Sequence, residues 1–191
     1  MTTEALLKPA NLNEKAPETF DVEFTTTKGN FTLRVTRAWA PLGADRFYNL
    51  AKNNFFDDAA FFRIVPNFIV QFGLSADPGV NRVWRSANIK DDPVAQSNKP
   101  GTITFATAGP NTRTTQLFIN FGNNAFLDRQ GFSPFGQITQ GMDVVKNLYS
   151  GYGESPDQGA ITSQGKAYLD KSFPKLDSVK TTRISAPGGA D

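Results

Sequence analysis

The stretch Phe61-Phe62-Arg63-Ile64-Val65-Pro66-Asn67-Phe68-Ile69-Val70-Gln71-Phe72-Gly73 carries the most structural information in the chain. Apolar and β-branched residues fill its two halves, and Pro66-Asn67 separates them, so the pattern predicts two short strands joined by a turn. Phe68 falls on the opposite face from Ile69 and Gln71 if the second strand is regular. We therefore expect the segment to bend at this point or to lie at a sheet edge.

Arg63 is a charged residue inside an otherwise apolar strand. A lone arginine at such a position is more often a surface or interface residue than a functional one. Its role therefore has to be judged together with the motifs found elsewhere in the chain.

Towards the N-terminus, the sequence predicts a hairpin followed by a helix. Apolar and polar residues alternate over Phe20–Thr25 and again over Phe31–Val35, with a turn at Thr27–Asn30 between them. This is the pattern of two half-buried antiparallel strands. From Pro41 to Ala51 the apolar residues recur at helical spacing, so a helix is expected there.

Towards the C-terminus, short β-rich runs alternate with loops. Further strands are predicted over Thr102–Thr107, Leu117–Phe121, Phe135–Ile138 and Asp177–Ile184. A second helix is predicted over Met142–Tyr149, with Gly151 as its stop. Leu74–Gly101 is polar and interrupted by prolines, which predicts a long surface loop, and Gly153–Lys175 is expected to be irregular.

These elements predict a mainly β fold. Eight short strands with two helices, one near each end, favour a closed antiparallel β-barrel capped by two α-helices over βαβ units. The 17 phenylalanines would fill such a barrel. The folded domain is expected over residues 20–184, between a flexible N-terminal segment at residues 1–19 and a flexible C-terminal tail at residues 185–191.

The composition excludes several kinds of chemistry. The 191 residues include no cysteine and no histidine, which rules out thiol nucleophiles, disulfides, Cys-ligated zinc and Ser–His–Asp triads. The formal net charge is +2 and no long run of like charges occurs, so neither nucleic acid nor a membrane is an expected partner. No apolar stretch approaches the roughly 20 residues of a membrane helix.

The start of the chain bears on location. The segment Met1–Ala10 contains Glu4 and no long apolar core, unlike a signal peptide. We expect a soluble protein. It would be cytoplasmic for the chain as given, and periplasmic or secreted if Met1 replaces a removed signal peptide.

No motif indicates a cofactor or a metal. Gly151-Tyr152-Gly153 lacks the third glycine of a dinucleotide-binding turn, and Gly159–Lys166 departs from a phosphate-binding loop in its spacing. The acidic pairs Asp57-Asp58 and Asp91-Asp92 are better explained as solvated turns in polar loops than as metal ligands. We therefore expect no cofactor and no metal.

Two further stretches have the character of motifs. The first is Phe105-Ala106-Thr107-Ala108-Gly109-Pro110-Asn111-Thr112-Arg113-Thr114-Thr115-Gln116-Leu117-Phe118-Ile119, and the second is Phe126-Leu127-Asp128, followed by Phe135-Gly136. Taken with residues 61–73 and the helix phrase at residues 40–47, they closely resemble the cyclophilin family of peptidyl-prolyl cis-trans isomerases, and its bacterial members in particular. The resemblance extends over residues 20–184.

The resemblance implies a cyclophilin-like fold and proline isomerisation without a cofactor, with Arg63 as the catalytic arginine. The residues that it assigns to substrate binding are Phe68, Ile69, Gln71, Ala106, Thr107, Ala108, Gln116, Phe118, Phe126 and Leu127. Thr107 stands where many members have asparagine, and Phe126 stands where many eukaryotic members have tryptophan. The pocket histidine of many members has no counterpart, and no residue of Gln130-Gly131-Phe132 is assigned to its place.

These residue types suit the reaction on physical grounds. Rotation about an X-Pro bond faces a barrier of about 20 kcal/mol but breaks no covalent bond, so neither histidine nor cysteine is needed. The twisted prolyl nitrogen gains lone-pair density, and a guanidinium placed over it donates a hydrogen bond that the planar ground state accepts poorly. A rate gain of about 10⁵ requires on the order of 7 kcal/mol.

Three functions remain to be separated. The leading one is a monomeric isomerase that acts on proline-containing polypeptides and assists folding, with only weak cyclosporin binding because Phe126 lacks an indole N–H. The second is a proline-peptide binding module or holdase chaperone with little turnover, which would need the pocket but not Arg63. The third is a lipocalin-like carrier, which the many bulky phenylalanines argue against.

Overall fold

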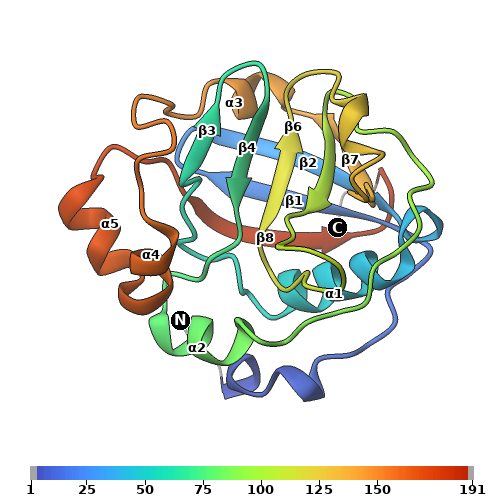
Figure 1. Cartoon of the computed structure of the whole chain (residues 1–191), viewed down its shortest axis with the longest axis horizontal. Helices are drawn as coiled ribbons and strands as arrows, with labels where there is room; N and C mark the ends of the chain where they lie inside the picture. The colour runs from blue at the N-terminus through green and yellow to red at the C-terminus, as the bar shows by residue number, and fades with distance from the viewer. Residues whose placement is uncertain (1–3, 189–191) are drawn as a thin grey trace.

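All eight predicted strands form and lie in one antiparallel sheet, in the order β3-β4-β6-β5-β7-β2-β1-β8 (Figure 1). The computed structural model describes residues 4–188. The strands are β1 (Thr19–Thr26), β2 (Gly29–Thr36), β3 (Arg63–Val65), β4 (Ile69–Phe72), β5 (Thr102–Phe105), β6 (Leu117–Asn120), β7 (Gly136–Gln140) and β8 (Val179–Ser185).

The sheet is curled, with β3 and β8 at its two ends, so the predicted closed barrel is not confirmed. The segments that lead into these end strands do approach each other. Phe61 N donates to Asp177 O and Val179 N donates to Ala59 O, each at 2.9 Å, and Ala60 forms an isolated bridge with Ser178. Asp58 N also donates to Val179 O at 2.8 Å. Isolated backbone bonds of this kind span the gap, because the strand ladders of β3 and β8 do not meet.

The described residues contain five α-helices, where the sequence analysis predicted two. They are α1 (Pro41–Lys52), α2 (Pro78–Trp84), α3 (Met142–Lys146), α4 (Gln158–Gln164) and α5 (Lys166–Ser172). The α1 helix is as predicted, and α3 ends earlier than predicted, before Gly151. None of the helices within residues 4–188 is long and apolar enough to cross a membrane.

The predictions of a loop over 74–101 and of irregular structure over 153–175 are therefore wrong in part. Within the first stretch, the side chain of Asp77 accepts from Gly79 N at the start of α2, and Pro78 occupies the first turn. Within the second, the side chain of Asp157 accepts from Ala160 N at the start of α4. Both helices are too short for their apolar period to stand out from the polar sequence around them.

Residues 4–18 also differ from the flexible segment that was predicted. They carry the 3-10 helices η1 (Glu4–Leu7) and η2 (Pro9–Asn11), and Leu6 is buried. Trp84 Nε1 donates to Leu6 O at 2.7 Å, and Ala16 N donates to Asp45 Oδ1 at 2.9 Å. These contacts join the N-terminal segment to α2 and α1. Residues 1–3 and 189–191, which belong to the predicted flexible ends, lie outside the described residues.

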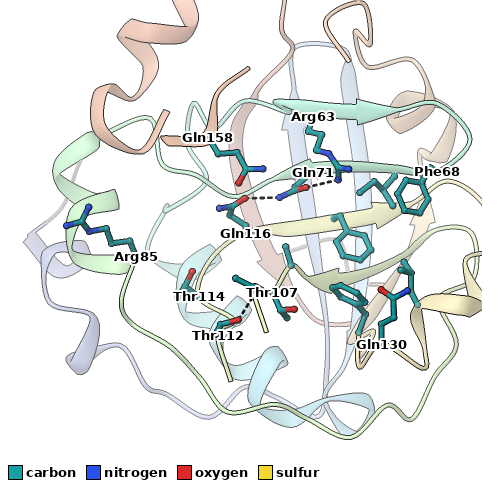
Figure 2. A pocket seen from close by; sticks show the side chains of 16 residues that line it. Arg63, Phe68, Gln71, Arg85, Thr107, Thr112, Thr114, Gln116, Gln130 and Gln158 are labelled. Atoms are coloured by element: carbon teal, nitrogen blue, oxygen red, sulfur yellow. Dashed lines mark hydrogen bonds between the residues drawn. The ribbon is translucent and has the colours of Figure 1, made fainter. Parts of the chain in front are cut away.

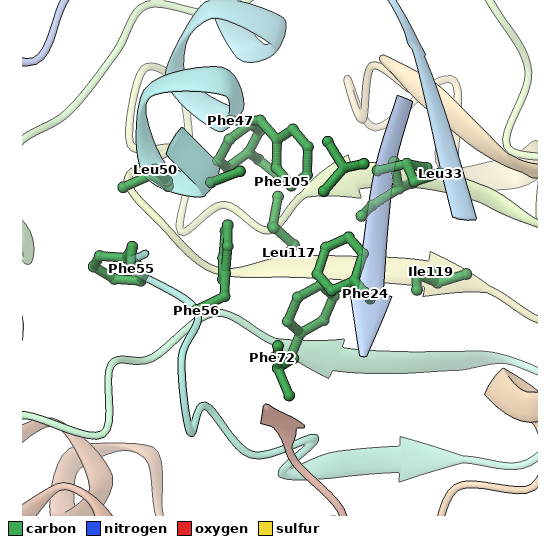
Figure 3. Packing of buried hydrophobic residues seen from close by; sticks show 14 of the residues in the cluster. Phe24, Leu33, Phe47, Leu50, Phe55, Phe56, Phe72, Phe105, Leu117 and Ile119 are labelled. Carbon is green, nitrogen blue, oxygen red and sulfur yellow. The ribbon is translucent and has the colours of Figure 1, made fainter. Parts of the chain in front are cut away.

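The interior of the curled sheet is filled by aromatic rings (Figure 3). Phe24 stacks on Phe31 with ring centroids 4.7 Å apart, and Phe47 lies 5.2 Å from Phe135. The largest fully buried side chains are Trp84, Phe20, Phe24, Phe31, Phe47, Phe55, Phe56, Phe61, Phe62, Phe72, Phe105 and Phe135. An interior packed with rings among the described residues is unlike the hollow barrel that a lipocalin-like carrier needs, so the packing argues against that function.

Candidate active site

Strands β3 and β4 place Arg63 and Gln71 opposite each other. The two residues are partners in the register of the hairpin, so their side chains emerge on the same face of the sheet. The turn between the strands contains Asn67 at a φ of 67°, and it brings Phe68 round to the cleft that Ile69 also lines. The bend expected at Phe68 is confirmed.

A chain of side-chain hydrogen bonds crosses the floor of this cleft (Figure 2). Arg63 Nη1 donates to Gln71 Oε1 at 3.1 Å, and Gln71 Nε2 donates to Gln116 Oε1 at 2.8 Å. Gln71 is only 6% exposed, and both ends of its side-chain amide bond to other side chains in place of water. The chain fixes the orientation of the two amides and holds the Arg63 guanidinium against one wall.

The cleft has a volume of about 670 Å³ and an apolar end. Ile69, Phe118 and Leu127 are buried there and form a small cluster of their own, apart from the main core. Phe132 packs edge-on against Phe118 with ring centroids 5.4 Å apart. A preformed apolar pocket beside a few oriented polar groups is the usual arrangement of a small-ligand site.

The other end of the cleft is polar and is built by the loop after β5. Thr107, Ala108, Thr112 and Thr114 line it, together with Gln116. Thr112 Oγ1 accepts from Ala108 N and donates to Gly109 O, both at 2.8 Å. These bonds give the loop a defined conformation and leave exposed backbone groups that an extended peptide could bind.

The structure brings nearly all of the predicted site residues together. Those that line the cleft are Arg63, Phe68, Ile69, Gln71, Ala106, Thr107, Ala108, Gln116, Phe118 and Leu127. Phe126 is the one predicted site residue that does not line the cleft, and its side chain is 54% exposed. Its ring stacks on Phe68 with centroids 6.0 Å apart and an interplanar angle of 16°, which places it at the rim.

Three asparagines form a hydrogen-bonded network next to the apolar end. Asn98, Asn120 and Asn124 are buried, and each uses both N–H groups of its side-chain amide. Asn98 Nδ2 donates to Phe132 O at 3.1 Å, and Asn124 Nδ2 donates to Phe68 O at 3.0 Å. The network therefore fixes the backbone that carries two aromatic residues of the cleft.

Asp128 anchors the same network at the segment that carries Leu127. Its carboxylate accepts from Ser97 Oγ at 2.6 Å and from Asn98 N and Nδ2 at 2.8 and 2.7 Å. Burial alone would raise the pKa of Asp128, but these hydrogen bonds outweigh it and lower the pKa. The charged form of Asp128 is thus the one that the fold stabilises.

Sequence reasoning missed several lining residues. Phe132 and Gln130 lie in the stretch to which no role was assigned, and the structure places both at the cleft. Arg85, at the end of α2, and Gln158, on α4, also line it. No signal could have found Gln158, since it lies 87 positions from Gln71 along the chain and its helix was not predicted.

The prediction of a solvated acidic pair at residues 91–92 is wrong for Asp92, whereas Asp91 is exposed as expected. Asp92 is buried and pairs with Arg113 at 3.0 Å, and it also accepts from the backbone N of Leu42 and Gly43 at the start of α1. This carboxylate stabilises the positive end of the helix, where no side chain of the N-cap residue does so. Within residues 4–188, no three acidic side chains converge as metal ligands would.

Comparison with known proteins agrees with this geometry. The model of the cyclophilin-type peptidyl-prolyl cis-trans isomerase/CLD family matches residues 20–165. A peptidyl-prolyl cis-trans isomerase of Acinetobacter baylyi is 34% identical over 133 residues, which cover 66% of this chain and 70% of the relative. A peptidyl-prolyl cis-trans isomerase-like 1 of Aspergillus niger is 33% identical over 134 residues, covering 67% of this chain and 80% of the relative.

Solved structures show the same fold. A cyclophilin-type peptidyl-prolyl cis-trans isomerase of Cryptosporidium parvum superposes with a TM-score of 0.66 at 18% identity, covering 88% of this chain and 98% of that one. Another structure of the same protein, solved in the presence of the dipeptide Ala-Pro, gives a TM-score of 0.65 at 19% identity, covering 87% of this chain and 99% of that one. The family model spans most of the chain and the relatives agree with it, so the chain belongs to the cyclophilin-type peptidyl-prolyl cis-trans isomerase family.

Proposed function

We propose that Arg63 is the catalytic residue of this isomerase and that the cleft binds a polypeptide around an X-Pro bond. The proline ring occupies the apolar end, among Ile69, Phe118 and Leu127. The residues before proline extend over the polar end, where Gln116 and the loop at residues 106–108 offer backbone and amide partners. Removal of the ring from water strengthens the hydrogen bond made beside it.

The observation that carries this proposal is the position of the Arg63 guanidinium. It is bound to Gln71 on a wall of the cleft whose other end is apolar. A guanidinium has five N–H donors and keeps its charge at all working pH values. When the prolyl nitrogen loses its conjugation, the arginine can donate to it, and this bond exists only in the twisted state.

The chief alternative is a binding module or holdase with little turnover. Such a protein would need the apolar pocket but no oriented cation beside it, and the hydrogen-bond chain from Arg63 to Gln116 favours the enzyme. The dipeptide Ala-Pro, present in one structure of the Cryptosporidium parvum neighbour, has the chemistry that the apolar end of this cleft would take.

The two functions are separated by measuring peptide binding and isomerisation with the same substrate. A short Ala-Pro peptide with a high initial cis fraction is mixed with the full chain, and the approach to equilibrium is followed. The enzyme accelerates this approach in proportion to its concentration. Saturable binding of the peptide without acceleration would instead establish the binding module.

A further inference from the structure

The helical segment at residues 151–176 reaches the candidate active site. Glu154, at its start, directs Oε2 to Arg63 Nε at 2.8 Å and to Arg63 Nη2 at 2.8 Å. Gln158, one turn further on, lines the cleft and points toward Gln116 in Figure 2. Irregular structure was expected over residues 153–175 and no role was assigned to them, yet Glu154 supplies a carboxylate to the residue that carries the proposed chemistry.

The backbone around Glu154 is held next to Arg63. Ile64 N, one residue after Arg63, donates to Gly153 O at 3.2 Å, so the segment pairs with the free edge of β3. Tyr152 packs edge-on against Tyr149 and Phe173, with ring centroids 5.1 and 5.0 Å apart. Glu154 is therefore carried by an anchored turn and not by a free loop.

The helices of the segment are docked on the same part of the sheet. Ile161 of α4 and Leu169 of α5 are buried in a second apolar cluster that includes Phe62, the residue before Arg63. Lys166 N also donates to Ala76 O at 2.9 Å, which links the segment to the chain before α2. The packing ties the position of Glu154 to the strand that bears Arg63.

We propose that Glu154 is a positioning residue, which holds the Arg63 guanidinium in the orientation that catalysis needs. The proposal rests on the role of Arg63 given above. Glu154 occupies Nε and Nη2, and Gln71 occupies Nη1, so three of the five N–H donors are engaged and the others are left for the prolyl nitrogen. An arginine held at two sides in this way loses little freedom when the transition state forms.

The exposure of the pair sets the size of the effect. The side chains of Arg63 and Glu154 are 27% and 61% exposed, so water and salt screen their attraction. Exposed ion pairs of this kind have small coupling energies, and we expect roughly a two- to five-fold effect. Because the bond orients a group that acts in the transition state, the effect falls on kcat and leaves KM nearly unchanged.

The experiment compares Glu154→Ala, Glu154→Gln, Arg63→Ala and the double variant, with kcat and KM measured separately on an Ala-Pro peptide. Glu154→Ala lowers kcat by roughly two- to five-fold, and Glu154→Gln restores most of the loss because an amide oxygen still accepts from Nε. In the Arg63→Ala background, Glu154→Ala has no further effect, as expected for a residue that acts only through Arg63.

Asp170→Ala is the matched control. Asp170 lies in the same segment, is 63% exposed, and forms an ion pair with Lys166 at 2.7 Å, and neither residue lines the cleft. Its loss changes the net charge by the same amount and leaves kcat unchanged. A fall in kcat with this variant equal to that of Glu154→Ala would show a general charge effect and overturn the proposal.

Two other results would overturn it. One is Glu154→Ala with wild-type kcat while Arg63→Ala is inactive, and the other is a raised kcat, which would show that Glu154 competes with the substrate. If Arg63→Ala itself retains wild-type activity, the proposed function fails, and this outcome is distinct from the first two.

NMR gives a readout that does not depend on activity. The Arg63 Nε–H resonance moves towards its solvent-exposed position in Glu154→Ala and not in Asp170→Ala.

Discussion

The Nη1 atom of Arg63 donates a hydrogen bond to Oε1 of Gln71 at 3.1 Å, across two adjacent antiparallel strands. Because Gln71 is buried and its Nε2 is bound to Gln116, the amide cannot turn away without breaking both bonds. The position of the guanidinium therefore depends on a residue whose own orientation is fixed from the other side.

We predict that Gln71→Leu lowers kcat/KM about tenfold. The change removes a hydrogen bond to a charged group, which contributes on the order of 1.5 kcal/mol. Leucine fills a similar volume, so the fold should persist. The measurement is the isomerisation rate of an Ala-Pro peptide, with Gln137→Leu on the exposed face of β7 as the control. Equal rates for both variants and the wild type would show that the hydrogen-bond chain has no part in catalysis.

Gly73 permits the close approach between the end of β4 and the chain before β6. Its φ is +108°, and a Cβ atom there would lie 2.3 Å from Thr115 O. Gly109 has a similar φ of +126° but nothing within 4 Å of a Cβ. The pair therefore separates backbone strain from crowding.

We predict that Gly109→Ala destabilises the fold by about 1–2 kcal/mol, the cost of placing an ordinary residue in a left-handed conformation. Gly73→Ala should cost several times as much, because the backbone of Thr115 has to move as well. This movement would also strain the hydrogen bond from Thr115 Oγ1 to Gly73 O, which is 2.8 Å long in the wild type. Urea unfolding of the two variants tests this. Similar free energies of unfolding for both would contradict the crowding argument.

The strand pattern of the sheet could be predicted from the sequence, since every strand shows alternation or a β-branched run bounded by turns. Strand periodicity places Gln116 and Phe118 on one face, but their grouping with Arg63 and Gln71 in one site followed from the family motifs. The hairpin register explains afterwards why Arg63 and Gln71 share a face. Strands can be predicted from local sequence because the alternation of apolar and polar residues arises between near neighbours in the chain.

The remainder depends on contacts between residues that are far apart in the chain. Asp92 stands in a polar loop and looks solvated, but its partner Arg113 and the start of α1 bury it. Glu154 has no motif around it, and its contact with Arg63 spans 91 positions. Leu6 is buried where η1 packs against α2, itself not predicted, and Trp84 Nε1 donates to its carbonyl oxygen. Such pairings leave no mark in a local window.

Several titratable groups have shifted pKa values, each with a physical cause in the structure. The hydrogen bond from Arg34 lowers the pKa of Asp21 below its usual 3.8. At Asp45 burial opposes ionisation, but the bonds from Arg37 and Ala16 N outweigh it and lower the pKa. Burial, with repulsion from Arg113, lowers the pKa of Arg46 to about 10.

We predict that kcat/KM varies by less than about twofold between pH 6 and 9 on a peptide that does not titrate, because the sequence has no histidine or cysteine to ionise there.

We also predict that the free energy of unfolding falls in acid. Asp21, Asp45 and Asp128 have lowered folded pKa values, so their stabilisation is present above the unfolded pKa and is lost as the pH falls through the folded values.

Burial raises the pKa of Asp57, so its effect on the free energy of unfolding has the opposite pH dependence. Its contribution to stability is present at low pH and is lost as the pH rises through its folded pKa. We expect the loss at Asp21, Asp45 and Asp128 to dominate in acid, because protonation breaks hydrogen bonds that these three carboxylates accept, whereas at Asp57 it mainly relieves the cost of burial. Rate profiles and urea unfolding at pH 3 and pH 5 test the two statements. A tenfold step in kcat/KM between pH 6 and 9, with the circular dichroism unchanged, would reveal an ionising group at the site.

Phe126 determines the predicted response to cyclosporin. In members with tryptophan at this position, the indole N–H donates to the drug, and Phe126 has no such donor. Its ring is exposed at the rim and stacked on Phe68, so a tryptophan can replace it without repacking the core. We predict weak binding by the wild type and a gain of about 1 kcal/mol, roughly five-fold in Kd, for Phe126→Trp. Calorimetric titration that gives equal Kd values would refute the missing-donor argument.

The central claim is that Arg63 stabilises the twisted X-Pro bond, and the isomerisation rate of Arg63→Ala tests it most directly. The variant should retain the fold, since Arg63 lies at the cleft surface with its side chain 27% exposed. Loss of one transition-state donor predicts a 10²–10³-fold lower kcat/KM, or about 2.7–4 kcal/mol, and Arg63→Lys should restore it only in part. A folded Arg63→Ala protein that keeps more than half of the wild-type activity would contradict the account.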